Sequence, residues 1–264
     1  EIDNSFIPRT ADTIGPCVVG RASRGIAMQP LRVESYSEFV ENFGETVPGG
    51  GTGDVYRDGN YQSPMYGIYA AKAFLRPNVA PLTYVRVLGH QHPDCSEDGA
   101  AGWKTKLFAG STGGGAYGLF VAKKSELDQA SGSAAVHATA SLSAIWYLDE
   151  GKIELSGSLY GDAIACVTSS VGTAILSDTN GVFKARVVTG SGASQATAEI
   201  VNFSLDETDR RYIRKVFNTN PQLVSSSGTS FYASSLLKQY WLGETYEQET
   251  RDALSGTLSG EQLV

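Results

Sequence analysis

Residues 14–44 read IGPCVVGRASRGIAMQPLRVESYSEFVENFG and contain the clearest succession of structural signals in the chain. The apolar run Cys17–Val19 predicts a short buried strand, and the alternation over Leu31–Glu34 predicts a second strand. Ser35 stands three residues before Glu38, which is the spacing of a capping box at the beginning of a helix. The stretch therefore predicts a strand, a glycine-containing connection, a second strand and a capped helix.

The next segment extends this pattern to residue 89. Ser63 precedes Pro64, and the pair predicts the N-cap and first turn of a second helix that runs to Arg76. A strand is predicted over Leu82–Leu88, with Val85 and Val87 on one face. Strand, helix and strand in this order predict a mixed α/β unit over residues 14–89. The side chains that we expect the second helix to bury are Met65, Ile68, Tyr69 and Leu75.

From about His90 the pattern changes to short alternating runs. A glycine-rich hinge is expected within Thr105–Lys123, and Asp178-Thr179-Asn180-Gly181 carries the Asn-Gly signal of a tight hairpin. We expect no helix longer than about three turns within residues 135–203. The fold class predicted for the chain is therefore α+β. Strands are expected at residues 119–122, 135–148, 152–155, 173–176, 182–188 and 198–203.

A helix is predicted from Asp206, and another over Ser234–Leu242. On the first helix, four cations would form a basic strip, because residues four apart lie one turn apart. A solvated helix face explains such a strip, and so does an ion-pairing contact with an acidic neighbouring copy of the chain. The four cations are Arg210, Arg211, Arg214 and Lys215. The predicted organisation is thus residues 1–92, a β-rich insertion at 93–205 and a helical return segment at 206–264.

Composition excludes several classes of protein. The 264 residues carry a formal net charge of −7, and a nucleic-acid surface would need clustered cations instead. Three cysteines far apart suggest no disulfide framework and fit a reducing compartment. No apolar stretch is long enough to predict a membrane span.

No motif predicts an enzyme. Residues 113–118, GGGAYG, match the dinucleotide fingerprint only formally, because a strand-like run follows where a helix is required, and we interpret them as a turn. A metal site at His90, His92, Asp94 and Cys95 is not expected, because neighbours in one short loop rarely converge on a metal. His137 has no evident acid and nucleophile beside it in the sequence, although catalytic triads assemble in space. We expect no catalytic residue, no metal and no cofactor.

The order of the N-terminal signals resembles the tail sheath proteins of bacteriophages with contractile tails. The residues that carry this resemblance are Val19-Gly20, Gly25, Ser35 to Phe39 and Phe43-Gly44, followed by Ala70 to Leu75 and Tyr84 to Val87. A second patch comprises Tyr212 to Pro221 and Tyr240 to Glu247. The resemblance implies that 1–92 and 206–264 belong to the sheath core and that 93–205 is inserted into it.

The resemblance further implies a virion protein that assembles in the cytoplasm of a host bacterium. Copies would form helical rings around the tail tube protein, contact baseplate and tail terminator proteins, and contract to drive the tube through the host envelope for genome ejection. In this family, terminal arms add strands to a neighbour's sheet. No C-terminal arm is recognisable, so we expect a truncated chain that stays soluble without forming tubes. A related contractile injection system, a β-rich adhesin or receptor-binding module, and a hydrolase remain alternatives.

Overall fold

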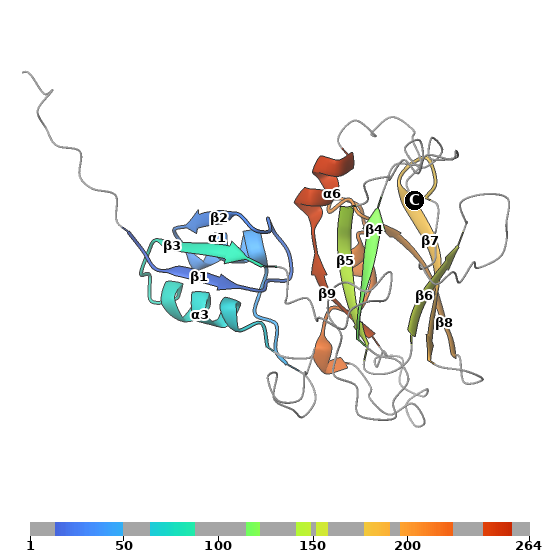
Figure 1. Ribbon diagram of the computed structural model, residues 1–264, viewed down its shortest axis with the longest axis horizontal. Coiled ribbons are helices and arrows are strands. Elements are labelled where there is room, and N and C mark those ends of the chain that lie inside the picture. The colour runs from blue at the N-terminus through green and yellow to red at the C-terminus, as the bar shows by residue number, and fades with distance from the viewer. Residues whose placement is uncertain are drawn as a thin grey trace, which may run out of the picture.

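The computed structural model describes residues 14–49, 64–87, 115–121, 141–148, 152–157, 177–190, 196–223 and 240–254. Within them the chain is α+β, as the sequence predicts, with three-stranded sheets ordered β1-β3-β2, β4-β5-β9 and β6-β7-β8 (Figure 1). The strands are β1 (Cys17–Gly20), β2 (Pro30–Val33), β3 (Leu82–Arg86), β4 (Gly115–Val121), β5 (Ser141–Leu148), β6 (Lys152–Gly157), β7 (Val182–Gly190), β8 (Ala196–Ser204) and β9 (Tyr240–Thr245). The helices are α1 (Tyr36–Phe43), α3 (Tyr66–Leu75), α5 (Ile213–Val216), α6 (Glu247–Leu254) and the 3-10 turn η2 (Pro221–Leu223).

The N-terminal unit comprises β1, β2, β3, α1 and α3. Strand β3 lies in the centre of its sheet, parallel to β1 and antiparallel to β2. Phe39 and Phe43 of α1 pack on Tyr84 of β3, with ring centroids 5.0 Å and 4.7 Å apart. All three side chains are fully buried. Burial of three aromatic side chains in one cluster explains why α1 stays on this small sheet.

The capping box predicted for α1 is confirmed with one difference. The Ser35 hydroxyl oxygen accepts a hydrogen bond of 3.1 Å from the Glu38 amide. The Glu38 carboxylate accepts one of 2.8 Å from the amide of Glu34, one residue before the cap. Gly44 ends the helix with φ of 89°, a conformation that favours glycine.

Two details of the N-terminal unit differ from the prediction. Strand β1 is an edge strand and is not buried: Val19 is 63% exposed. Helix α3 begins at Tyr66 with Met65 as N-cap and without a side-chain cap, and Ser63, the N-cap that was predicted, lies outside the described residues. Met65, Ile68 and Leu75 are buried as expected, whereas Tyr69 is exposed. Helix α3 comes closest to β1 at Gly20, the last residue of the strand, and Val19 beside it stays exposed.

The crossing of β1 and α3 depends on two glycines. A Cβ atom at Gly67 would lie 2.6 Å from the Tyr84 hydroxyl oxygen and 2.9 Å from the Gly20 Cα atom. Only a residue without a side chain permits this approach of helix backbone to strand backbone.

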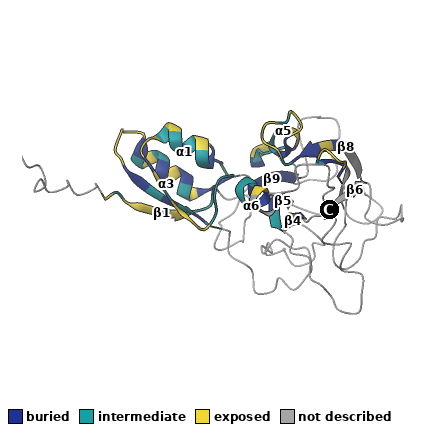
Figure 2. Ribbon diagram, turned by 90° about the horizontal axis from the view of Figure 1, so that it is seen from above, coloured by how far each residue is buried: buried dark blue, intermediate teal, exposed yellow. Residues whose placement is uncertain are grey.

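The sheet β4-β5-β9 lies between the N-terminal unit and the third sheet (Figure 1). Ile145 and Tyr147 of β5 belong to the core of the N-terminal unit, whereas Ala144 and Trp146 belong to a second core with β7 and β8. In β9, Trp241 belongs to the core of the N-terminal unit and Leu242 belongs to the second core. Buried residues accordingly occupy both faces of this sheet (Figure 2). We refer to β4-β5-β9 as the central sheet.

The third sheet is an antiparallel meander that contains the predicted hairpin. The Asp178 amide donates to the Val182 carbonyl over 2.9 Å, and Gly181 adopts φ of 73° in the turn. The predicted strands at 152–155, 182–188 and 198–203 are confirmed as parts of β6, β7 and β8, and residues 173–176 lie outside the described residues. Within the described part of residues 135–203 the secondary structure is extended, with no helix.

The predictions for the return segment are wrong in two places. The helix expected from Asp206 is limited to the four residues of α5, because Asp206 and Asp209 hold the chain in turns by accepting local amide hydrogen bonds. Residues 240–242 were expected in a helix and lie instead in β9, which pairs with β5. A strand buried on both faces has no alternation of apolar and polar residues, so its sequence cannot be told from that of a buried helix.

The glycine-rich stretch around residue 115 also differs from expectation. Gly115 to Gly118 form the first part of β4 and pair with β5 as far as Leu148. Gly113 and Gly114 lie outside the described residues. The boundaries at residues 92 and 205 stay predictions, although the central sheet unites β4 and β5 with β9 of the return segment. Among the described helices, none combines the length and apolar character that a membrane span requires.

Candidate functional site, a buried arginine junction

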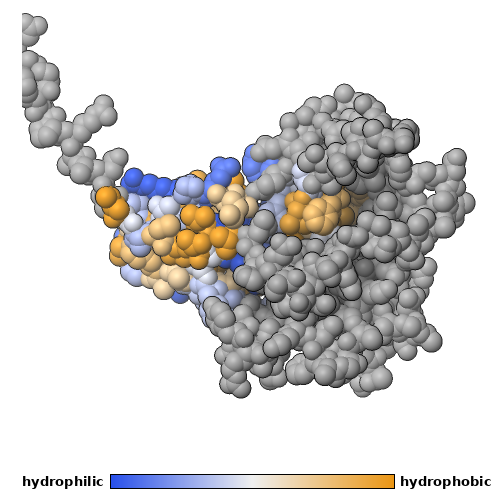
Figure 3. Space-filling view, viewed as in Figure 1, coloured by the Kyte–Doolittle hydropathy of each residue, from blue (hydrophilic) through white to orange (hydrophobic). Residues whose placement is uncertain are grey.

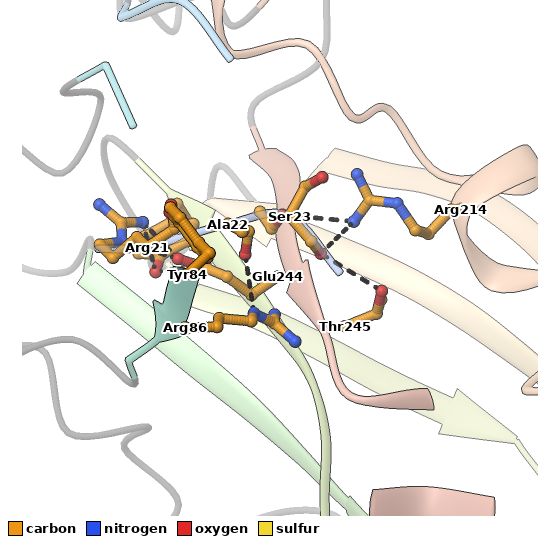
Figure 4. Close-up of polar contacts among 10 residues, drawn as sticks. Arg21, Ala22, Ser23, Tyr84, Arg86, Arg214, Glu244 and Thr245 are labelled. Carbon is orange, nitrogen blue, oxygen red and sulfur yellow. Dashed lines mark hydrogen bonds and ion pairs between the residues drawn. The ribbon is translucent and has the colours of Figure 1, made fainter. Parts of the chain in front are cut away.

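The segment 21–25, which follows β1, is held between strand β3 on one side and strand β9 on the other. The Ser23 carbonyl oxygen accepts a hydrogen bond of 3.0 Å from the Thr245 amide, so this segment continues the edge of the central sheet by one bond. The Tyr84 hydroxyl donates to the Arg21 carbonyl over 2.8 Å. Side chains from both sides converge on these carbonyl oxygens (Figure 4). We call this region the arginine junction, comprising Arg21, Arg86, Arg214, Tyr147, Glu244 and Glu247.

Arg21 and Glu244 form its buried ion pair. The Glu244 Oε1 atom lies 2.8 Å from Arg21 Nε and 2.5 Å from Nη2, and the two side chains are only 12% and 3% exposed. Burial by itself lowers the pKa of the Arg21 guanidinium, but the Glu244 carboxylate raises it above its ordinary value. The Tyr147 hydroxyl donates to Glu244 Oε2 over 2.6 Å, and burial raises the pKa of Tyr147. Both oxygens of the carboxylate are therefore paired.

Arg86 reaches the junction from β3 and is completely buried. Its Nε atom donates to the Ala22 carbonyl over 3.0 Å, and its Nη1 atom donates to the Gly25 carbonyl over 2.5 Å. The guanidinium carbon lies 4.2 Å from the ring centroid of Tyr246, close enough for a cation–π interaction. Its Nη2 atom has no hydrogen-bond partner among the described residues. Arg86 thus ties β3 to the segment after β1 through backbone oxygens instead of a carboxylate.

Arg214 approaches from α5 on the opposite side. Its Nη1 atom donates to the carbonyl oxygens of Ser23 and Gly243, over 3.2 Å and 3.3 Å. Burial lowers the pKa of Arg214, and the nearby charge of Arg86 lowers it further, while Glu247 raises it. Gly243 is the unpaired residue of a bulge in β9, where the register with β5 shifts. The bulge turns the Gly243 carbonyl toward Arg214, as bulges often re-aim groups at strand edges.

Glu247 supplies the second carboxylate of the junction at the beginning of α6. Its Oε1 atom accepts hydrogen bonds from the Tyr212 hydroxyl and the Thr245 hydroxyl. Burial raises the pKa of Tyr212, and the charge of Glu247 raises it further. Three guanidinium groups therefore face two carboxylates in the junction.

The groups of the arginine junction are suited to a structural role. Arginine stays protonated at all ordinary pH values and acts as a fixed donor, so it holds backbone oxygens in place instead of transferring protons. Within the described residues, no group of three or more His, Cys, Asp or Glu side chains is placed to hold a metal ion. The junction joins the N-terminal unit to the central sheet and to α5 with hydrogen bonds of fixed geometry.

The predicted basic strip does not form as a helical stripe. Arg214 is half-buried in the junction, and Arg211 pairs with Asp209 over 2.9 Å. The Lys215 ammonium donates to the carbonyl oxygens of Glu207 and Asp209, each over 3.1 Å. Arg210 is exposed. A contact of the three exposed cations with a neighbouring copy stays a prediction.

The histidines and their neighbours that were considered as metal ligands or catalytic residues are not described by the structure. His90, His92, Asp94, Cys95 and His137 lie outside the described residues, and the absence of metal binding stays a prediction. The sequence signals did not predict a role for Arg21, Arg86 or Glu244. One signal was available, because Arg86 follows Leu82 and Tyr84 at every second position and so belongs to the buried face of β3.

Comparison with known proteins adds no assignment. No family model matches the chain, and no curated protein matches it either.

Proposed function

We propose that this protein is a structural subunit of the contractile tail sheath of a bacteriophage. Copies of the chain polymerise in helical rings around the tail tube, and contraction drives the tube through the host envelope. The proposal places the protein in the virion, in contact with tube, baseplate and tail terminator proteins. It requires no catalytic residue and no cofactor. Its starting point is the ordered set of signals in residues 14–44 that resembles sheath proteins.

The arginine junction is the observation that carries this proposal. In a contractile sheath, subunits must move nearly as rigid bodies while their contacts with neighbours are exchanged. A subunit of several layers meets this requirement only if its layers are fixed to one another. Here Arg21 and Glu244 form a buried ion pair across two layers, and Arg86 and Arg214 bind neighbouring carbonyl oxygens, of Ala22 and Ser23. Such an arrangement favours a subunit that transmits force without bending internally.

The outer surface of the N-terminal unit supports the same proposal. An edge strand, β1, leaves Val19 63% exposed, and Tyr66 of α3 is exposed to the same extent. Uncharged surface of this kind is expected where a protein meets other proteins. A hydrolase would instead need a nucleophile beside a base in a cleft.

Electron microscopy of the natural full-length protein tests the proposal. A sheath subunit assembles into striated tubes or polysheath at high protein concentration, whereas an adhesin or a hydrolase stays dispersed. The variant Glu244→Gln provides a matched probe, because it weakens the junction without changing the molecular surface. We expect tubes from the unaltered protein and fewer or irregular tubes from the variant. Folded full-length protein that forms no tubes with or without tube protein would overturn the proposal.

A further inference from the structure

The hairpin turn before β7 contains the one Asn-Gly pair of the sequence, Asn180-Gly181. Asn180 is exposed to water. Glycine has no side chain, and a Cβ atom added at Gly181 would meet no atom within 4 Å apart from its chain neighbours. The peptide group between the two residues is therefore open to solvent and uncrowded.

An asparagine that precedes a glycine is chemically labile, because its side chain can react with the next backbone nitrogen. The Gly181 amide nitrogen loses its proton to water and bonds to the Asn180 Cγ atom. The bond from Cγ to Nδ2 breaks, and Nδ2 takes up a proton and leaves as ammonia. One water molecule then opens the resulting five-membered imide at either carbonyl carbon. The products are aspartate and isoaspartate, in which the backbone continues through the side chain, and water is the only co-reactant.

Asp178 holds three successive amides of this turn. Its Oδ1 atom accepts a hydrogen bond of 2.9 Å from the Asn180 amide and one of 2.8 Å from the Val182 amide. Its carbonyl oxygen accepts a hydrogen bond of 3.1 Å from the Gly181 amide. The nitrogen that would attack Asn180 therefore has its proton engaged, and the residues on both sides of it are fixed. The reaction requires this turn to open.

We propose that Asn180 is a site of spontaneous deamidation and that Asp178 sets its rate by holding the turn closed. The reaction proceeds from a locally opened form, whose population falls as the hydrogen bonds to Asp178 become stronger. This inference goes beyond the proposed function and does not depend on it, because it uses only the hairpin and its chemistry.

The turn borders the second core, so its modification should affect stability. Ser177 and Phe183 form a β-bridge across the turn, and the Phe183 ring stacks on Phe203 with centroids 5.1 Å apart. Isoaspartate lengthens the backbone between Ser177 and Phe183 by one carbon atom. Its free carboxylate also adds a negative charge two residues after that of Asp178, and like charges repel. We therefore expect the modified chain to unfold at a lower urea concentration.

Peptide mapping by mass spectrometry, on the folded chain kept in mildly alkaline buffer, measures conversion at Asn180. We expect aspartate and isoaspartate to accumulate there. Asp178→Ala removes the Oδ1 acceptor and should raise the rate about tenfold, which corresponds to about 1.4 kcal/mol for opening of the turn. Asp178→Asn keeps an Oδ1 acceptor without the charge and is the matched control, with a rate close to that of the unaltered chain.

Urea unfolding of the aged chain measures the effect on stability. Tryptophan fluorescence is a suitable signal, because Trp146 packs in the second core. Hydrophobic dyes would bind the native protein as well, since apolar side chains are exposed on the N-terminal unit (Figure 3). Asn180→Asp carries the added charge without the added backbone carbon, and it should lose less stability than the isoaspartate form.

Circular dichroism verifies that the variants are folded. If Asp178→Ala is unfolded, conversion in the folded unaltered chain is compared with conversion of the same chain in urea, which should be at least about tenfold faster. Equal rates in the folded and unfolded chain would overturn the inference, and so would a folded chain that never converts at Asn180. A folded Asp178→Ala variant with an unaltered rate, or an Asp178→Asn variant as fast as Asp178→Ala, would equally overturn the role of the Asp178 acceptor.

Discussion

The N-terminal unit and the central sheet are stabilised over very different distances along the chain. In the N-terminal unit, Ser35 caps the helix that it precedes, and Phe39 packs on Phe43 one turn later, with ring centroids 5.1 Å apart. In the central sheet, β5 pairs with β9, which follows only after three further strands and α5. Local interactions thus contribute to the N-terminal unit beside the pairing of β3 with β1 and β2, whereas the central sheet depends on the pairing of β5 with the still more distant β9.

The N-terminal unit depends on the central sheet for part of its hydrophobic core. The N-terminal unit has its own helices and aromatic cluster, but Ile145, Tyr147 and Trp241 of the central sheet complete its core. The two regions therefore share apolar contacts as well as the arginine junction. We expect them to unfold together, and the predictions below test that expectation from the largest effect to the smallest.

Truncation of one aromatic side chain in each core should have the largest effect. Phe39→Ala and Phe203→Ala each remove a fully buried ring and should lower the free energy of unfolding by about 4 kcal/mol. Urea unfolding should be followed by circular dichroism, which reports on the helices, and by tryptophan fluorescence, since Trp146 and Trp241 lie in the central sheet. The two signals should shift together in both variants.

Phe120→Ala is the control for this pair, because that side chain is 43% exposed. Its effect should stay below about 1 kcal/mol. If Phe39→Ala shifted the circular dichroism transition and left the fluorescence transition in place, the N-terminal unit would be an independent folding unit.

Removal of the charge of Glu244 should have the next largest effect. Glu244→Gln leaves the Arg21 guanidinium buried without a carboxylate, which should cost about 3 kcal/mol of unfolding free energy. Glu34→Gln, which removes an exposed ion pair with Arg32, should cost less than about 1 kcal/mol. The double variant Arg21→Met, Glu244→Met should be more stable than Glu244→Gln, because no unpaired charge remains in it. Equal losses in Glu244→Gln and Glu34→Gln would show that the junction contributes no more than a surface pair.

The same difference explains how much could be predicted from the sequence. The helix after Ser35, the turn at Asn180-Gly181 and the strands β2, β3, β7 and β8 follow from local signals, and all were predicted. Strand β9 was mistaken for a helix because Tyr240, Trp241 and Leu242 are all buried, on two opposite faces of a sheet. Such a run has no period of two.

The arginine junction was missed for a related reason. Arg21, Arg86 and Arg214 come from three separate parts of the chain, and each looks like a surface residue by type. Their role depends on which carbonyl oxygens the tertiary structure brings to them. Arg214 illustrates this, because its expected place on an exposed helix face required a helix that Asp206 and Asp209 interrupt.

Loss of a local cap should have a smaller effect. Ser35→Ala removes the hydroxyl oxygen that accepts from the Glu38 amide and should lower the free energy of unfolding by about 1 kcal/mol. Ser37→Ala, in the first turn of the same helix, is the matched control and should change the stability by less than about 0.5 kcal/mol. Chemical denaturation of both variants provides the measurement. A loss in Ser35→Ala no greater than that of the control would mean that packing of Phe39 and Phe43 holds α1 without its cap.

The smallest effect should come from the turn that interrupts the predicted helix. The Arg211 side chain donates to the Asp209 carboxylate, and the Arg211 amide donates to the same group. Together they lower the pKa of Asp209 to about 2. Because the folded-state pKa lies below the ordinary value of about 3.8, ionised Asp209 stabilises the folded protein above pH 4. That contribution should disappear as the pH falls from 4 toward 2.

Carbon-detected NMR titration of the Asp209 carboxyl group measures this shift directly. Arg211→Gln should return the pKa most of the way to its ordinary value, whereas Arg210→Gln, which alters a neighbouring cation without a hydrogen bond to Asp209, should change it little. The change in overall stability should be close to the limit of detection, since the pair is exposed and water screens it. A pKa of Asp209 that Arg211→Gln leaves unchanged would show that the turn at residues 206–212 does not depend on this pair. The interruption of the helix would then have to originate in the burial of Tyr212 and Ile213 against β8, and so in the long-range packing that distinguishes the β-rich part of the molecule.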